Sequence, residues 1–126
     1  MPAGKYSILI EQGSTFSIEL AYKDSTGIPI NLTGYSGKMQ IRPSVDSNDV
    51  YITLSSSLQP DGTGINFSGS YNLNPPTSGT IGLYISARSS SLFNFNEGVY
   101  DLEISSGSYT TRILEGQVKL SKEVTR

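Results

Sequence analysis

The side chains in this chain best able to do chemistry are carboxylates, because the sequence contains no histidine and no cysteine. Asp101 and Glu103 are two residues apart, so on an extended strand they share one face, and a glycosidase-type acid and base pair needs two such carboxyl groups in one cleft. They alternate, however, with Tyr100, Leu102 and Ile104, a pattern typical of a strand with one buried and one solvated face. We therefore expect both carboxylates to face solvent, and we predict no catalytic residue.

Metal and phosphate sites are equally poorly supported. Asp46, Asp49 and Asp61 could offer oxygen ligands to calcium, but the twelve-residue spacing of an EF-hand is absent. The Gly62-Thr63-Gly64 segment lacks the Lys-Ser/Thr that completes a phosphate-binding loop. Zinc fingers, thiol chemistry and histidine-dependent triads lack their residues altogether. The sequence therefore predicts no cofactor and no metal, with calcium kept only as an alternative.

The charge balance speaks against nucleic acid and membrane partners. Nine basic and eleven acidic residues give a net charge of −2, and the basic residues are spread along the 126-residue chain. A nucleic-acid binder usually gathers its cations into a basic face. No apolar run approaches the roughly 18 residues of a membrane span, and residues 8–10 are too short to be the apolar core of a signal peptide. We expect a single soluble domain over residues 1–126.

Tyrosine is the remaining candidate for binding, since it combines apolar area with a polar tip. Of eight tyrosines, Tyr22, Tyr35 and Tyr100 fall on apolar strand faces and are expected in the core. Residues 68–79 carry two adjacent prolines and are expected to form an irregular surface segment. The predicted partner contacts are Tyr51, Tyr71, Pro75, Pro76, Tyr84 and Tyr109.

The elements that position these residues are predicted to be strands. Apolar and polar residues alternate cleanly over 16–22, and similar short blocks predict strands at 6–10, 35–42, 50–54, 64–67, 80–86, 99–104 and 109–120. Residues 28–32 form a short extended segment whose Pro29 suits an edge. One short helical turn is expected near 89–95, capped by Ser89, Ser90 or Ser91. Seven or eight strands at this spacing indicate a sandwich or a barrel.

Two features are expected where the last strands meet. Ser106-Gly107 is predicted to be the turn of a hairpin. The apolar residues change from an odd position at Ile113 to even positions from Leu114 onward, close to Gly116, which indicates a β-bulge.

Three segments together resemble small bacteriophage virion proteins with an immunoglobulin-like β-sandwich, and are similar to the N-terminal domain family of phage upper baseplate proteins. The first is Ile10 to Phe16 (IEQGSTF), and the second is Ile28 to Arg42 (IPINLTGYSGKMQIR). The third joins Gly98 to Glu103 (GVYDLE), Thr111 to Gly116 (TRILEG) and the final Glu123 to Arg126 (EVTR).

The resemblance implies an immunoglobulin-like antiparallel β-sandwich of seven or eight strands and a function without catalysis. The expected protein is a virion structural component, located in the tail or baseplate, that assembles with other virion proteins as a homo-oligomer in a symmetric assembly. Two alternatives stay open. One is a capsid decoration or cement protein, and the other is a carbohydrate-binding module that attaches to a host glycan through surface tyrosines.

Overall fold

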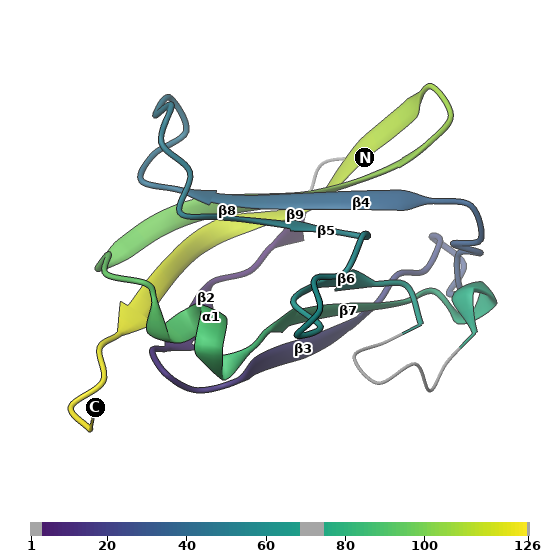
Figure 1. The fold of residues 1–126 in the computed structure, drawn as a ribbon. Coiled ribbons are helices and arrows are strands. Elements are labelled where there is room, and N and C mark those ends of the chain that lie inside the picture. Colours follow the sequence, from purple (N-terminus) through teal and green to yellow (C-terminus); the bar gives the residue numbers. More distant parts are fainter. Residues whose placement is uncertain (1–3, 69–74, 126) are drawn as a thin grey trace.

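Two β-sheets packed face to face make up the protein (Figure 1). The computed structural model describes residues 4–68 and 75–125. The large sheet has the order β1-β9-β8-β4-β5, with β2 also paired to β9, and the small sheet has the order β3-β7-β6. The strands are β1 (Gly4–Lys5), β2 (Ile8–Glu11), β3 (Phe16–Ala21), β4 (Ser36–Arg42), β5 (Ile52–Ser55), β6 (Gly64–Asn66), β7 (Thr80–Ile85), β8 (Glu97–Ser106) and β9 (Tyr109–Ser121).

This topology confirms the predicted all-β sandwich. Strands β9, β8, β4 and β5 follow one another as the G, F, C and C′ strands of an immunoglobulin domain do, and β3, β7 and β6 match its B, E and D strands. Two details differ from the expectation. Within the described residues there are nine strands, because the first strand is divided into β1 and β2, and both of these pair with β9 in the parallel direction.

The core lies between the sheets and follows from period-two alternation. In β8, Tyr100, Leu102 and Ile104 are all at most 4% exposed, as predicted from the alternation with Asp101 and Glu103. In β3 the inward side chains are only half-buried, because this strand lies at the edge of the small sheet. The fully buried side chains come from both layers: Ile10, Leu32, Met39, Ile41, Leu54, Ile65, Ile81, Leu83, Ile85, Leu102, Ile104 and Val118.

The prediction for the helical turn was wrong in its position. Helix α1 spans Ala87–Ser91, and its N-cap is Ser86, not Ser89, Ser90 or Ser91. Ser86 has an extended backbone, so its hydroxyl accepts a hydrogen bond from the Ser89 amide at 3.0 Å. The residue that directly follows β7 therefore supplies the cap. A second short element, the 3-10 helix η1 (Pro76–Ser78), was not predicted.

The expected hairpin and bulge are both present between β8 and β9. The turn lies one residue later than the predicted Ser106-Gly107, because Ser106 still pairs with Tyr109. Its residues are Gly107 and Ser108, with Gly107 at a φ of 60°, a conformation that favours glycine. The pairing passes from Leu102 opposite Leu114 to Glu103 opposite Arg112, so Ile113 is the additional residue. Residues 103–113, which lie beyond this bulge, form a hairpin arm whose tip stands away from the large sheet at the upper right of Figure 1.

Candidate interaction surface

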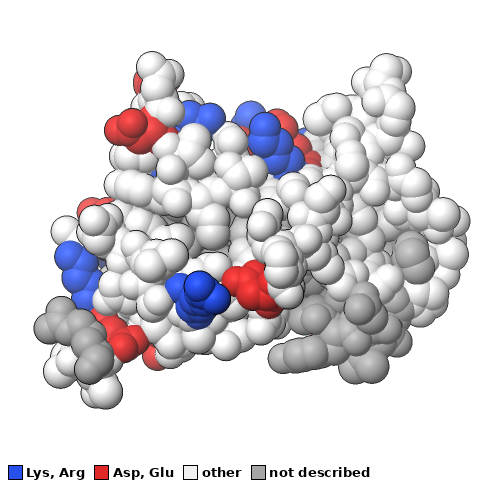
Figure 2. All heavy atoms as spheres, in the orientation of Figure 1, with Lys and Arg blue, Asp and Glu red and all other residues white. Residues whose placement is uncertain are grey.

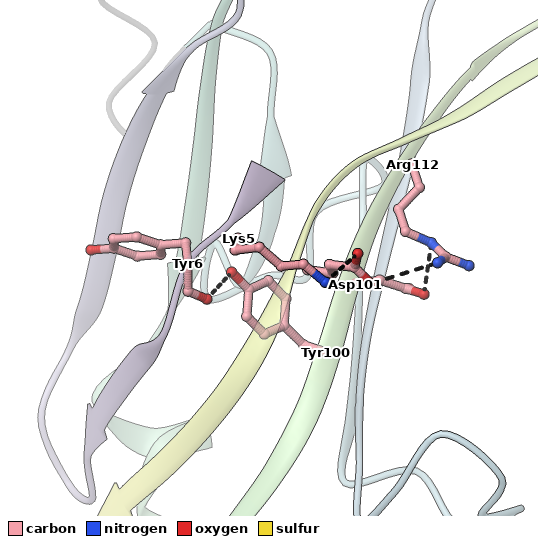
Figure 3. Close-up of polar contacts among 6 residues, drawn as sticks. Lys5, Tyr6, Tyr100, Asp101 and Arg112 are labelled. Carbon is pink, nitrogen blue, oxygen red and sulfur yellow. Dashed lines mark hydrogen bonds and ion pairs between the residues drawn. The ribbon is translucent and has the colours of Figure 1, made fainter. Parts of the chain in front are cut away.

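Charged side chains form a compact cluster on the outer face of the large sheet (Figure 3). The Lys5 ammonium donates a hydrogen bond to Glu115 Oε1 at 3.0 Å. Arg112 Nε lies 3.3 Å from Asp101 Oδ2, and its Nη1 lies 3.6 Å from Glu115 Oε2. Asp101 and Glu115 are direct neighbours across β8 and β9, and like charges at such positions repel. The two cations therefore neutralise a pair of carboxylates that the strand register forces together.

The surroundings of Asp101 and Glu103 suit a structural role for these two carboxylates better than a role as an acid and base pair. Asp101 and Glu103 lie on the face opposite Leu102, as the sequence predicts. An acid and base pair needs one carboxyl group held protonated in a weakly polar site. Here Asp101 is bound to a guanidinium, and both carboxylates remain partly solvated. The geometry thus gives no support to hydrolysis at these residues.

Two shallow hollows lie on the same polar face. One of about 400 Å³ is lined by polar residues of four strands, among them Lys5, Gln40, Arg42 and Gln117. Its Arg42 is held in place, because it donates to the Ser47 carbonyl and to Gln40 Oε1, both at 2.8 Å. The other, of about 450 Å³, is lined mainly by hydroxyl groups and by Lys38 and Glu103. Charged and polar side chains outnumber apolar ones in both linings, unlike those of a typical small-molecule site.

Asp61 is engaged by hydroxyl groups of the protein itself. Its Oδ2 accepts hydrogen bonds from Ser86 Oγ at 2.6 Å and from Ser89 Oγ at 3.0 Å, and its Oδ1 accepts one from the Thr63 amide. These bonds, led by that of Ser86, hold the pKa of Asp61 far below its usual value. Asp61 thus ties the loop before β6 to the start of α1. Within residues 4–68 and 75–125, no group of three or more acidic side chains is placed to hold a metal ion.

The predicted contact residues lie apart from one another. Tyr51 is half-buried, with its ring stacked on Phe95 at a centroid distance of 4.2 Å. Tyr84 is half-buried on β7, and Tyr109 is 61% exposed at the start of β9. Pro75 is exposed, Pro76 begins η1, and Tyr71 lies outside the described residues. None of the three described tyrosines lines either hollow, so no stacking platform for a sugar is formed by them.

Tyr109 is the one of these tyrosines that stands on an exposed edge. It lies near Tyr22, whose pKa is raised by burial and, to a smaller extent, by Tyr109 and Tyr35. Figure 2 shows charged groups over the left, upper and lower central parts of the molecule, whereas the protruding tip at the upper right carries none. Residues 104–111 indeed contain no charged side chain. The end of the hairpin arm is therefore an uncharged, exposed surface next to a tyrosine cluster.

No known protein family and no curated protein sequence matches this chain. In the described part of the chain, no helix has the length and apolar character needed to cross a membrane. Assignment of a function therefore depends on the surface just described and on the sequence resemblance.

Sequence reasoning missed a polar contact that joins the ends of the chain. Gln12 Nε2 donates to the Phe93 carbonyl at 2.6 Å, and Gln12 Oε1 accepts from the Glu123 amide at 2.8 Å. Gly13 lies against the Glu123 carboxylate so closely that a Cβ there would overlap it. The Gln-Gly pair and the final segment both belong to the segments that resemble phage proteins, but no local pattern shows that they meet.

A second contact missed from the sequence fastens the N-terminal strand (Figure 3). The buried Tyr100 donates its hydroxyl to the Tyr6 carbonyl at 2.7 Å, and the Tyr6 amide donates to the Glu115 carbonyl at 3.0 Å. Burial raises the pKa of Tyr100 to about 12. Gly116 permits this approach, because a Cβ on it would lie 2.1 Å from the Tyr6 oxygen.

Proposed function

We propose that this chain is a non-enzymatic structural protein of a bacteriophage virion, in the tail or baseplate, that acts by assembling with its own copies and with neighbouring virion proteins. The observation that carries the proposal is the hairpin arm, residues 103–113, whose outer part, residues 104–111, is uncharged and exposes Tyr109 next to the turn. An open strand edge is a template for pairing with another chain, and virion proteins assemble through repeated contacts of this kind.

The segments that resemble phage proteins also make contacts that stabilise the fold, which supports the proposal. In the second segment, Asn31 Oδ1 accepts from the Thr33 amide at 3.0 Å, and Gly34 has a φ of 81°, so that together they shape a corner. In the first and third, Gln12 binds the backbone of Glu123, and Tyr100 binds the backbone of Tyr6. These residues hold a scaffold together, as expected of a protein whose function is contact.

The experiment is electron microscopy of phage particles assembled with a tagged copy of this chain. We expect label on the tail or baseplate, in a number that matches the symmetry of that part of the particle. Label on the capsid shell would instead support a decoration protein and overturn the tail assignment. Particles without label, together with binding of the isolated chain to a host glycan, would overturn the structural role and favour a carbohydrate-binding module.

A further inference from the structure

The backbone groups of β9 that face away from β8 can be identified from the hydrogen bonds of its other edge. The carbonyl groups of Glu115 and Ser121 accept hydrogen bonds from the amides of Tyr6 and Gln12, respectively, so these residues point outward. Outward direction alternates with period two along a strand. The extra residue Ile113 shifts this alternation by one. Beyond the bulge, the outward residues are therefore Arg112 and Thr110.

Residues 109–113 of β9 form an open edge, which we call the arm edge. Thr110 and Arg112 are its outward residues. Pairing with β1 starts at Gly4 opposite Leu114, and no strand within the described residues covers β9 beyond that point. The amide and carbonyl groups of Thr110 and Arg112 thus make four hydrogen-bonding groups directed away from the sheet. The arm edge contains no proline, and threonine, tyrosine and isoleucine make up most of it, all residues favoured in strands.

We propose that the arm edge binds the arm edge of a second copy of this chain, antiparallel, about a twofold axis through Thr111. In this register Thr110 of each copy pairs with Arg112 of the other, so that all four outward groups of each copy are satisfied. Thr111 faces Thr111 between the two hydrogen-bonded pairs. The inference rests on the proposed function, since it specifies one of the contacts through which copies of the chain assemble.

The side chains fit the same register. Tyr109 comes opposite Ile113 of the second copy, an aromatic and β-branched pair of the kind that stabilises adjacent strands. Ile113 packs against the core, so the exposed Tyr109 gains a fixed apolar neighbour. Arg112 faces the uncharged Thr110 rather than another cation. The two Arg112 side chains are diagonal neighbours, and their repulsion is reduced because each is paired with Asp101 and Glu115.

Sedimentation analysis of the isolated chain over a range of concentrations tests the pairing. We expect a reversible dimer in the wild type. Thr110→Pro removes an outward amide in each copy without touching the β8–β9 ladder. Two hydrogen bonds of the dimer are lost, and the dissociation constant should rise at least about tenfold. The matched control is Thr110→Ala, which keeps the amide and should stay within about threefold of the wild type.

A charge exchange at the axis tests the register itself. Thr111→Lys and Thr111→Glu each place like charges opposite one another in a homodimer, so each variant should be monomeric. A mixture of the two should form a heterodimer, because the charges then complement each other. Thermal melting of each variant alone checks that the fold is kept. If either variant fails to fold, Thr110→Pro against Thr110→Ala still decides the proposal.

A wild-type chain that stays monomeric at every accessible concentration overturns the proposal. If a dimer then appears only after removal of residues 1–3, that segment competes for the arm edge, and the self-pairing is wrong for the whole chain. A wild-type dimer that Thr110→Pro leaves intact also overturns it, because the copies then meet elsewhere. These outcomes concern the isolated chain, whereas the labelled particles test the virion role, so the two can fail separately.

Discussion

Replacing Gly116 by alanine should detach the first strand from the large sheet. The added Cβ would lie 2.1 Å from the Tyr6 carbonyl oxygen and 2.8 Å from its carbon, which real structures do not tolerate. Gly116 is fixed by its pairing with Tyr100 in the middle of the sheet, whereas β1 holds an edge. We therefore expect Tyr6 to move, not Gly116.

The cost follows from the contacts that Tyr6 makes. Its amide bond to Glu115 and the Tyr100 hydroxyl bond to its carbonyl would both be lost, at about 1 kcal/mol each and more if the buried hydroxyl stays unpaired. Alanine recovers about 0.5–1 kcal/mol, because glycine is unfavourable within a strand. The free energy of unfolding should thus fall by about 1–3 kcal/mol.

Urea unfolding at one fixed protein concentration measures this loss. Gly4→Ala is the matched control, since a Cβ on Gly4 meets only ordinary contacts, the nearest at 3.6 Å from Leu114. A second measurement is the ultraviolet titration of the tyrosines. In Gly116→Ala the pKa of Tyr100 should fall from about 12 toward its ordinary value of 10.0. Equal unfolding midpoints for the two variants, with an unchanged titration, would refute the close approach of Tyr6 to Gly116.

The other predictions concern pH, the core and the helix cap. Between pH 10.0 and about 12 the unfolded state loses the Tyr100 proton while the folded state keeps it. The free energy of unfolding should therefore fall as pH rises, by at most about 3 kcal/mol. An equally steep decline in Tyr100→Phe would contradict this. Leu102→Ala should cost about 2–5 kcal/mol in a denaturant titration, and Leu20→Ala should cost less because Leu20 is half-buried; equal losses would mean that burial does not set the cost. Since the pKa of Asp61 is lowered on folding, its contribution to stability should be present above pH ~4 and disappear as pH falls further, and an Asp61→Asn variant should show a weaker acid dependence in thermal melts. Ser86→Ala should cost about 2 kcal/mol, because it removes both the helix cap and the hydrogen bond to Asp61, whereas Ser91→Ala, outside the cap, serves as its control.

The sequence predicts this fold well wherever burial alternates along a single strand. The alternation over Phe16–Ala21 and around Leu102 identifies both the strands and their faces, because a side-chain period of two is a local property. The bulge is also visible, since Ile113 and Leu114 are consecutive apolar residues in an otherwise alternating strand. The helix cap was misplaced because three further serines follow Ser86, and local chemistry alone does not distinguish them.

The surface was harder to predict, because its contacts join residues far apart in the chain. Tyr109 was expected to be exposed and is, but the stacking of Tyr51 on Phe95 joins the residue before β5 to the segment after α1 and could not be predicted from local sequence. The same holds for Gly116, whose requirement comes from a strand more than a hundred residues earlier. The open edge of β9 depends in turn on where β1 begins, which no pattern near Tyr109 records.

The bulge at Ile113 shifts by one residue which positions of β9 face outward. A change of length therefore has different effects at the root of the arm, near Ile113, and at its tip, near Gly107. Deleting Ile113 at the root would remove the bulge and its local bend, while Leu114 stays opposite Leu102 and Arg112 stays opposite Glu103. Adding one residue to each strand at the tip, beside Gly107, would leave every existing pair in place. The reach of this molecule can therefore vary at the tip without disturbing its interior, which makes the arm the part of the fold where length can be adapted to the spacing of neighbours.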